Sequence, residues 1–148
     1  LTQSGRVLHW RNSHDDDGLA VTMPQRELKP IPGADFPRYG DIYEVNLDPV
    51  VGSETGKRRP ALVVSNDINN EYSQTVTVLP TTGQPAKKQY PFEVLIPKGV
   101  AGLTVDSRIK ANQIRTVDKR RLVGFRGSLP SQYLPQVEKA LKIHLNLK

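Results

Sequence analysis

The chain has 148 residues, with 21 lysines and arginines against 15 aspartates and glutamates, a formal net charge of +6 and a pI of about 9.7. It contains no cysteine, which excludes disulfides, thiol nucleophiles, iron–sulfur clusters and cysteine-ligated zinc sites. The longest uninterrupted apolar run, Ala61–Val64, is far shorter than the ~18–20 residues that a membrane-spanning helix needs. We therefore expect a basic, cytoplasmic protein with a polyanionic partner, and nucleic acid is the first candidate.

Residues 1–37 differ in composition from the rest of the chain. They hold four basic and five acidic side chains, so residues 38–148 hold 17 basic and 10 acidic ones, a net charge of +7. The first segment contains an acidic run at Asp15–Asp17 and four prolines, without a sustained strand or helix period. Such a stretch buries too little apolar surface to offset its ordering entropy. We predict a disordered or non-native extension over 1–37 and one folded domain over 38–148.

From Arg38 onward, short segments with a strand pattern follow one another. Tyr39–Leu47 alternates apolar and polar residues and predicts a strand, whereas Asp48–Arg58, with one proline and two glycines, predicts a long loop. Further strands are predicted, in chain order, over Arg59–Asn66, Gln74–Leu79, Tyr90–Ile96 and Ser107–Val117. Short strands at this spacing are typical of a small antiparallel sheet or barrel.

Only the C-terminus shows a helical period. An apolar stripe runs from Leu134 to Leu145, with lysines outside it. Pro130 and Pro135 must then lie just before the helix or in its first turn, where a missing N–H is tolerated. The predicted fold class is mainly β with a C-terminal helix.

The histidines and carboxylates argue against two common nuclease designs. His9 and His14 fall in the predicted extension and His144 on the predicted helix, so no imidazole is well placed for acid–base chemistry or metal binding. The carboxylates are scattered and do not have the spacing of a metal cage. The chain also lacks the GxxxxGK[ST] and GxGxxG phosphate motifs. We expect a site with no metal and no cofactor.

The most informative segment is the loop from Gly52 to Pro60, which runs directly into an apolar strand. Its two glycines allow sharp turns and the close approach of a ligand, and Ser53, Glu54 and Thr55 add polar groups. Three adjacent cations stand where the loop becomes the strand: Lys57, Arg58 and Arg59. Because guanidinium groups match phosphate oxygens in a bidentate manner, we interpret this run as a phosphate clamp. A solvated turn is the commoner role of such a basic run taken by itself.

A second polar cluster, Pro80–Gln84, lies at a predicted strand end. It carries Thr81 and Thr82, whose hydroxyls are suited to hold a phosphate oxygen or to orient a nucleophile. Capping of free backbone groups is the commoner role of a single threonine at such a position. The cation run Lys119–Arg121 is more typical of a solvated turn.

A third cluster is Lys110–Arg115, which lies within a predicted strand. If the strand is continuous, alternate residues face opposite sides. Three residues then share one side and three the other: Lys110, Asn112 and Ile114 against Ala111, Gln113 and Arg115. Asparagine and glutamine amides suit base edges or sugars, although they are also ordinary edge-strand residues.

The order of these segments resembles the MazF/PemK family of toxin endoribonucleases. The likeness covers about Arg38–Leu147 and rests on GDI, LDP, GSETGKRRP, TVTVLPTT, YPFEV and NQIRTVDKRRL. It implies a compact SH3-like β-barrel with helices, usually a homodimer. It implies metal-independent, sequence-specific cleavage of single-stranded RNA, in which a ribose 2′-hydroxyl attacks the adjacent phosphorus and leaves 2′,3′-cyclic phosphate and 5′-hydroxyl ends. The implied partners are a cognate antitoxin and, for the complex, operator DNA that it represses.

Carried over motif by motif, the resemblance implies two catalytic residues. The arginine of the family's RP dipeptide falls on Arg59, and the threonine after the third strand falls on Thr82. Substrate contacts are implied for the GSE loop and the Q-x-R-T segment. With the basic run, the asparagine of the third cluster and a lysine of the next loop added, the predicted RNA-binding residues are Ser53, Glu54, Lys57, Arg58, Lys88, Asn112, Gln113 and Arg115.

The resemblance also favours one of two reaction schemes. PemK-type members use a histidine in the GSE loop and an Arg/Asp pair on a later strand, but here those positions hold Ser53, Lys110 and Asn112. In the remaining Arg/Thr scheme, Arg59 neutralises charge on the phosphorane, a contribution of ~3–4 kcal/mol per well-placed donor. A guanidinium stays protonated, so proton transfer by Arg59 is less expected than charge stabilisation. Thr82 either holds a non-bridging oxygen or positions the 2′-hydroxyl.

Two other functions fit the same fold. A gyrase-binding poison of the CcdB type needs a C-terminal aromatic tail, whereas this sequence ends in Leu-Asn-Leu-Lys. A catalytically dead module that only represses transcription with its partner would bind operator DNA without cleaving RNA.

Overall fold

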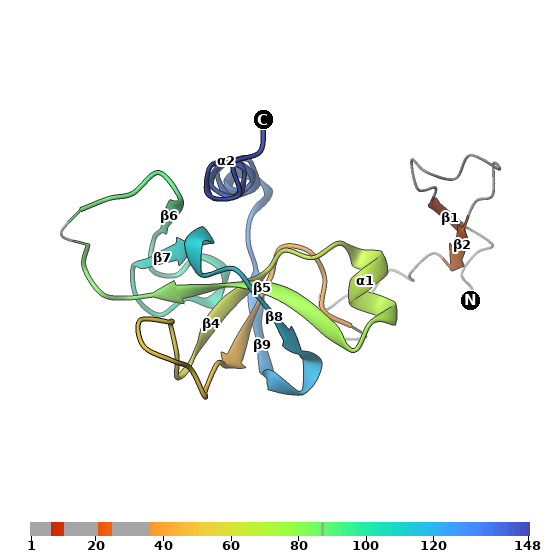
Figure 1. Cartoon of the computed structure of the whole chain (residues 1–148), viewed down its shortest axis with the longest axis horizontal. Helices are drawn as coiled ribbons and strands as arrows, with labels where there is room; N and C mark the ends of the chain where they lie inside the picture. Colours follow the sequence, from red (N-terminus) through yellow and green to blue (C-terminus); the bar gives the residue numbers. More distant parts are fainter. Residues whose placement is uncertain (1–6, 11–20, 25–35, 87) are drawn as a thin grey trace. The chain divides into compact units, whose positions relative to one another are not determined.

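The computed structural model describes residues 7–10, 21–24, 36–86 and 88–148, which belong to two units, residues 1–31 and 32–148 (Figure 1). In the first unit, β1 (Val7–Trp10) pairs antiparallel with β2 (Val21–Pro24). Most of the extension predicted over 1–37 lies outside the described residues, so its disorder stays a prediction.

The second unit is built on a seven-stranded antiparallel sheet. Its strands are β3 (Asp41–Asn46), β4 (Arg58–Val63), β5 (Thr75–Thr82), β6 (Glu93–Ile96), β7 (Ser107–Lys110), β8 (Arg115–Asp118) and β9 (Leu122–Ser128). The spatial order is β6-β7-β5-β4-β3-β9, and β8 pairs with β5 beside β7. The long strand β5 therefore contacts β4 along one edge and both β7 and β8 along the other.

Two α-helices accompany the sheet, α1 (Asp67–Tyr72) and α2 (Leu134–His144). The sequence pattern missed α1, because six residues are too few to show a helical period. Its start is fixed locally, since the Asn66 side chain accepts a hydrogen bond from the Asn69 N–H at 2.8 Å. The predicted C-terminal helix is confirmed, with Pro135 in its first turn.

Four 3₁₀ turns occur among the described residues of this unit: η1 (Val100–Gly102), η2 (Ala111–Gln113), η3 (Lys119–Arg121) and η4 (Ser131–Tyr133). The turn η2 interrupts the strand predicted over Ser107–Val117, so that β7 and β8 are separate. Within the described ranges, no helix has the length and apolar character needed to cross a membrane.

Two apolar clusters cover the two faces of the central strands. One contains Ile42, Leu62 and Leu79 and extends under α2 to Val137 and Ala140. The other is formed by the intervening residues of the same strands and by β8, and it includes Tyr43, Val45, Ala61, Val63, Val76, Val78 and Val117. Since successive residues of a strand face opposite sides, β3, β4 and β5 are covered on both faces. These strands therefore hold the side chains at their ends in rigid positions.

The fold class predicted from the sequence, mainly β with a C-terminal helix, is confirmed. The long loop predicted after the first domain strand is also present, between β3 and β4. The sequence pattern did not predict the edge strand β9. Only three residues, the basic run Lys119–Arg121, separate it from β8. Among the described residues no ladder joins β8 to β9, so the sheet is not a closed barrel.

Candidate functional site

The loop between β3 and β4 is held together by its own polar groups. Asp48 Oδ1 accepts a hydrogen bond from the Lys57 N–H at 2.7 Å, which ties the two ends of the loop. At its tip, Glu54 Oε1 accepts from the Val51 N–H at 2.7 Å. A Cβ added to Gly56 would lie 2.7 Å from Asp48 Oδ1, so a larger residue would displace the carboxylate that closes the loop. The loop is thus a fixed structure.

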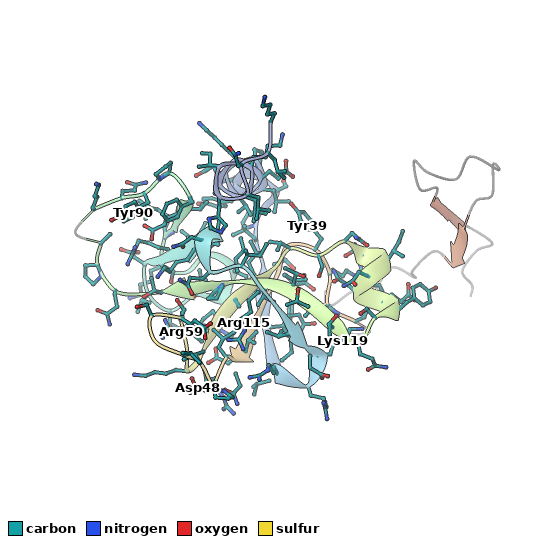
Figure 2. The ribbon with its side chains drawn as sticks, viewed as in Figure 1. Tyr39, Asp48, Arg59, Tyr90, Arg115 and Lys119 are labelled. Carbon is teal, nitrogen blue, oxygen red and sulfur yellow. The ribbon has the colours of Figure 1, made fainter. Side chains whose placement is uncertain are left out.

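Arg59 stands at the base of this loop, in the second position of β4. Its guanidinium Nε donates to the Gly56 carbonyl at 2.7 Å, and its Nη1 donates to the Thr81 carbonyl at 3.1 Å. The side chain is half-buried and lies beside the loop that carries Asp48 (Figure 2). One guanidinium therefore bridges the β3–β4 loop and the C-terminal end of β5.

Thr82 is the last residue of β5 and is 8% exposed. Its Oγ1 accepts a hydrogen bond from the Gln84 N–H at 3.2 Å. The ladder between β4 and β5 pairs Ala61 with Pro80, and continuing this register places Arg59 opposite Thr82. The structure thus brings the two predicted catalytic residues to the same end of the β4–β5 pair.

The neighbouring Thr81 has a different role. Its Oγ1 donates to the Pro60 carbonyl at 2.8 Å, and the residue is 2% exposed. Both threonines thus bind backbone groups, but Thr81 gives its hydroxyl proton to a carbonyl, whereas Thr82 accepts an N–H at the strand end and keeps its proton.

The turn η2 corrects the predicted alternation of Lys110–Arg115. Residues 111–113 follow a 3₁₀ path with three residues per turn, so the two predicted sides do not exist. Ala111 is buried, and Gln113 Oε1 accepts from the Thr55 N–H of the β3–β4 loop at 3.0 Å. In the part of the chain that the structure describes, the buried Asn112 Oδ1 has no hydrogen-bond partner.

Two arginines from later in the chain also reach the β3–β4 loop. Arg115 on β8 donates from Nη1 to the Leu47 carbonyl at 2.7 Å, and Figure 2 shows it on the same side of the unit as Arg59. Arg121 donates to the carbonyls of Asn46, at 3.1 Å, and of Asp48. The interpretation of the 119–121 run as a solvated turn is therefore wrong for Arg121, which holds the loop.

The same interpretation does fit the middle residue of that run. Arg120 is exposed and binds Asp118, and its guanidinium lowers the pKa of that carboxyl.

The charge around the loop is strongly positive. Five cationic side chains border it: Lys57, Arg58, Arg59, Arg115 and Arg121. The two carboxylates of the loop, Asp48 and Glu54, each accept a hydrogen bond from a backbone N–H. Such a surface attracts phosphate groups.

The remaining predicted contacts are distributed unevenly. Ser53 and Lys57 are exposed on the β3–β4 loop, and Arg58 is exposed at the start of β4, next to Arg59. Lys88 is exposed on the β5–β6 segment, where its Nζ lies 5.4 Å from the ring centroid of Tyr90. Figure 2 shows Tyr90 well away from Arg59. The structure therefore does not bring Lys88 to the loop.

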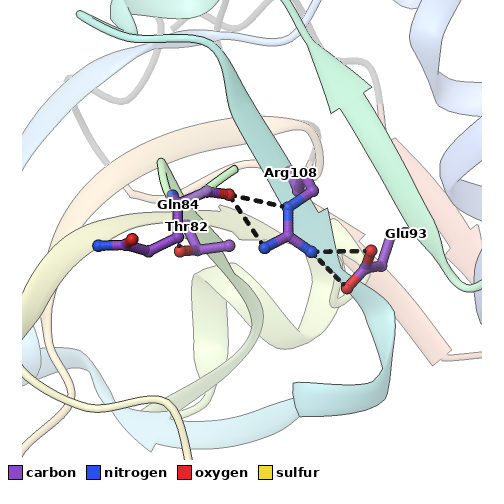
Figure 3. Close-up of polar contacts among 4 residues, drawn as sticks. All are labelled: Thr82, Gln84, Glu93 and Arg108. Atoms are coloured by element: carbon purple, nitrogen blue, oxygen red, sulfur yellow. Dashed lines mark hydrogen bonds and ion pairs between the residues drawn. The ribbon is translucent and has the colours of Figure 1, made fainter. Parts of the chain in front are cut away.

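Sequence reasoning missed an ion pair next to Thr82. Arg108 Nη1 donates to both carboxylate oxygens of Glu93 at 2.9 Å, while Nε and Nη2 donate to the Gln84 carbonyl at 3.2 and 3.1 Å (Figure 3). The sequence carries little signal for it, because Glu93 and Arg108 alternate with the core residues Val94 and Ile109 and so lie on the opposite strand face.

Comparisons with known proteins match this architecture. Residues 38–145 match the family described as PemK-like, MazF-like toxin of type II toxin-antitoxin system. Endoribonuclease MazF9 of Mycobacterium tuberculosis is 43% identical over 115 residues, covering 74% of this chain and 97% of that protein. Endoribonuclease EndoA of Bacillus subtilis is 44% identical over 108 residues, covering 73% and 93%.

A solved structure shares the fold as well. MazF from Deinococcus radiodurans has a TM-score of 0.67 at 31% sequence identity, covering 76% of this chain and 98% of that chain. MazE–MazF from the same organism has a TM-score of 0.61 at 30% identity, covering 76% and 98%.

Proposed function

Because the chain belongs to the PemK-like, MazF-like toxins of type II toxin–antitoxin systems, we propose that it is a metal-independent endoribonuclease that cuts single-stranded RNA. The observation that carries this proposal is the guanidinium of Arg59, which bridges the basic loop and the end of β5 one residue from Thr82. A phosphate group of the RNA bound there would contact a cation and a hydroxyl held in fixed positions, and such an enzyme needs both.

In the proposed reaction the nucleophile belongs to the RNA. The ribose 2′-hydroxyl loses its proton and attacks the adjacent phosphorus, the bond from phosphorus to the 5′-oxygen breaks, and that oxygen takes up a proton. The products are a 2′,3′-cyclic phosphate and a 5′-hydroxyl. The protein's task is mainly to align the two oxygens and to stabilise charge on the phosphorane.

Arg59 is suited to the charge-stabilising part. Its Nε and Nη1 are held by backbone carbonyls, and no partner of Nη2 occurs among the described residues. A guanidinium oriented in this way presents the remaining N–H groups in a fixed direction. We assign these donors to a non-bridging oxygen of the scissile phosphate.

Thr82 is suited to donate a hydrogen bond. Its Oγ1 already accepts the Gln84 N–H, and the hydroxyl keeps its own proton for an acceptor. A phosphate oxygen is such an acceptor, whereas the 2′-hydroxyl would have to give a proton away. Of the two roles that the sequence left open, we therefore propose that Thr82 holds a non-bridging oxygen.

The surrounding residues are assigned to RNA binding. Ser53, Lys57 and Arg58 are exposed where the phosphate backbone would pass. Asn112 is half-buried beside Gln113 in η2, and we assign its side-chain amide to the same region of the RNA. Gln113 uses its carbonyl oxygen on the loop and keeps its amide donors for a base edge. Of the other predicted contacts, Glu54 and Arg115 bind backbone groups and would shape the loop, and Lys88 would act on a more distant nucleotide.

The proposed partners follow the family. We propose a homodimer in the cytoplasm, a cognate antitoxin that blocks RNA binding, and repression of the operon by the complex on operator DNA. The similarity to MazF in the Deinococcus radiodurans MazE–MazF structure supports the antitoxin.

The test is RNA cleavage by the purified protein in the presence of EDTA. Arg59→Ala and Thr82→Ala should each lower kcat by ~10²–10³-fold, as expected for the loss of one oriented donor. Arg126→Lys, a change on β9, serves as the control for purification and folding and should cleave like the wild type. Intact RNA after incubation of folded wild-type protein with varied sequences would contradict the proposal. Operator binding without cleavage would select the non-catalytic repressor instead.

A further inference from the structure

Thr82 and Arg108 face each other across two neighbouring strands. They are Cα partners in the antiparallel ladder between β5 and β7, so their side chains leave the sheet on the same face. Glu93 lies on the next strand, β6, diagonal to Arg108 in the β6–β7 ladder. Three strands thus place one hydroxyl, one guanidinium and one carboxylate in a row (Figure 3).

The carboxylate fixes the guanidinium. Both Glu93 oxygens accept from Arg108 Nη1 at 2.9 Å, and the two side chains are only 4% and 15% exposed. In so little water the pair has few alternative partners. The remaining N–H groups of Arg108 are therefore aimed in one direction, and two of them donate to the Gln84 carbonyl.

The backbone of Gln84 links the oriented Arg108 guanidinium to Thr82. Its carbonyl is held by Arg108, and its N–H donates to Thr82 Oγ1. The intervening turn is exposed, but on one side it lies against Val105, since a Cβ on Gly83 would be 2.9 Å from Val105 Cγ2. Movement of the Gln84 carbonyl is thus transmitted to the N–H that orients the hydroxyl.

We propose that Arg108 and Glu93 are positioning residues that hold the Thr82 hydroxyl in its productive rotamer through the Gln84 backbone. This inference rests on the proposed function. The Gln84 N–H occupies an acceptor site of Thr82 Oγ1 and so directs the hydroxyl proton away from the turn, toward a phosphate oxygen. Without the anchor, Thr82 is free to occupy its other staggered rotamers, in which the donor points elsewhere.

The variant that tests this is Arg108→Lys. Lysine keeps the charge beside Glu93 but lacks the planar fork that reaches the carboxylate and the Gln84 carbonyl together. We expect kcat for RNA cleavage to fall about tenfold, the equivalent of roughly one net hydrogen bond, with KM unchanged. Arg126→Lys is the matched control, since Arg126 also joins a carboxylate, of Glu44, to a backbone carbonyl, of Gly102.

A double-mutant cycle separates positioning from a general loss of structure. If Arg108 acts through Thr82, then Arg108→Lys should have no effect on kcat in a Thr82→Ala background. The same tenfold loss in both backgrounds, or a rise in KM at constant kcat, would overturn the inference. Should Arg108→Lys fail to fold, Glu93→Gln removes the charge while keeping an amide oxygen, and the same cycle applies.

A readout independent of activity is hydrogen exchange of the Gln84 amide. The exchange rate should rise in Arg108→Lys and stay at its wild-type value in Arg126→Lys. Unchanged exchange with an active wild type would overturn the positioning role alone. A wild type that cleaves no RNA would instead overturn the proposed function, and the catalytic part of this inference with it.

Discussion

Two arginine–glutamate pairs of similar geometry lie at different places in the sheet. Arg108 on β7 binds Glu93 at 2.9 Å and the Gln84 carbonyl, and Arg126 on β9 binds Glu44 at 2.8 Å and the Gly102 carbonyl at 2.8 Å. Each arginine thereby joins a carboxylate on a neighbouring strand to the backbone of a turn.

The two pairs differ in what the anchored turn carries. The turn held by Arg108 continues to the Thr82 hydroxyl, whereas the turn held by Arg126 is η1, where a Cβ on Gly102 would lie 2.2 Å from the Arg126 carbonyl oxygen. The same contact thus orients a reactive group in one place and packs a turn in the other. Contact geometry alone does not separate the two roles, but kinetics and stability measured together do.

The largest expected effect compares removal of each arginine. Arg108→Met leaves the Glu93 carboxylate buried without its partner, and the free energy of unfolding should fall by ~3–5 kcal/mol. Arg126→Met breaks a pair whose side chains are 25% and 24% exposed, so the loss should be about 1 kcal/mol. Urea denaturation followed by circular dichroism measures both. Equal losses would show that the difference in burial does not matter here.

The next effect concerns the cation at the site. Arg59→Lys retains the charge but not the simultaneous contacts with Gly56 and Thr81, so kcat should fall by roughly 10²-fold. Its unfolding free energy should change by less than that of Arg108→Met, because Arg59 has no buried carboxylate partner among the described residues. Single-turnover cleavage of a labelled RNA measures the rate. Cleavage within twofold of wild type would mean that a point charge is sufficient.

The smallest effect concerns a carboxyl in the β3–β9 region, near the Arg126 pair. Asp41 is 2% exposed, and burial raises its pKa above the usual 3.8, although the Arg38 N–H and the Ser128 hydroxyl donate to it. The native state then keeps a proton that the unfolded chain has lost. The resulting stabilisation is complete below about pH 3.8 and disappears as the pH rises through the raised pKa.

Asp41→Asn removes this dependence. The unfolding free energy of the wild type relative to Asp41→Asn should therefore decrease as the pH rises from below 3.8 toward neutrality. Urea titrations of both proteins across that range measure the difference. An increase with pH would mean that the hydrogen bonds outweigh burial and that the pKa is lowered.

The sequence predicts the position of a site residue when that position is set by the residue's own stretch of chain. Arg59 and Thr82 stand at the ends of strongly apolar strands, so their placement follows from pattern and turn residues. The basic loop is predictable for the same reason, since its glycines and its cations lie together in the sequence.

Residues that act through a distant partner were not predictable. Arg108 and Glu93 meet because of the register between β6 and β7, which a single sequence does not specify. The alternation expected over residues 110–115 failed because η2 bends the chain where Gln113 binds the β3–β4 loop, a contact over 58 residues. The short helix α1 was not predictable either. Its six residues are too few to show a helical period, although local hydrogen bonds, such as the one from the Asn69 N–H to Asn66, fix its start.

The central claim is that the end of the β4–β5 pair, with Arg59 and Thr82, cleaves RNA without a metal. The most direct test is to incubate a long single-stranded RNA with the purified protein in EDTA and to sequence the new 5′ ends after ligation chemistry selective for 5′-hydroxyls. The account predicts 5′-hydroxyl ends at a recurring short sequence, formed ~10²–10³-fold more slowly by Thr82→Ala. New 5′-phosphate ends, or ends formed equally by wild type and Thr82→Ala, would contradict it.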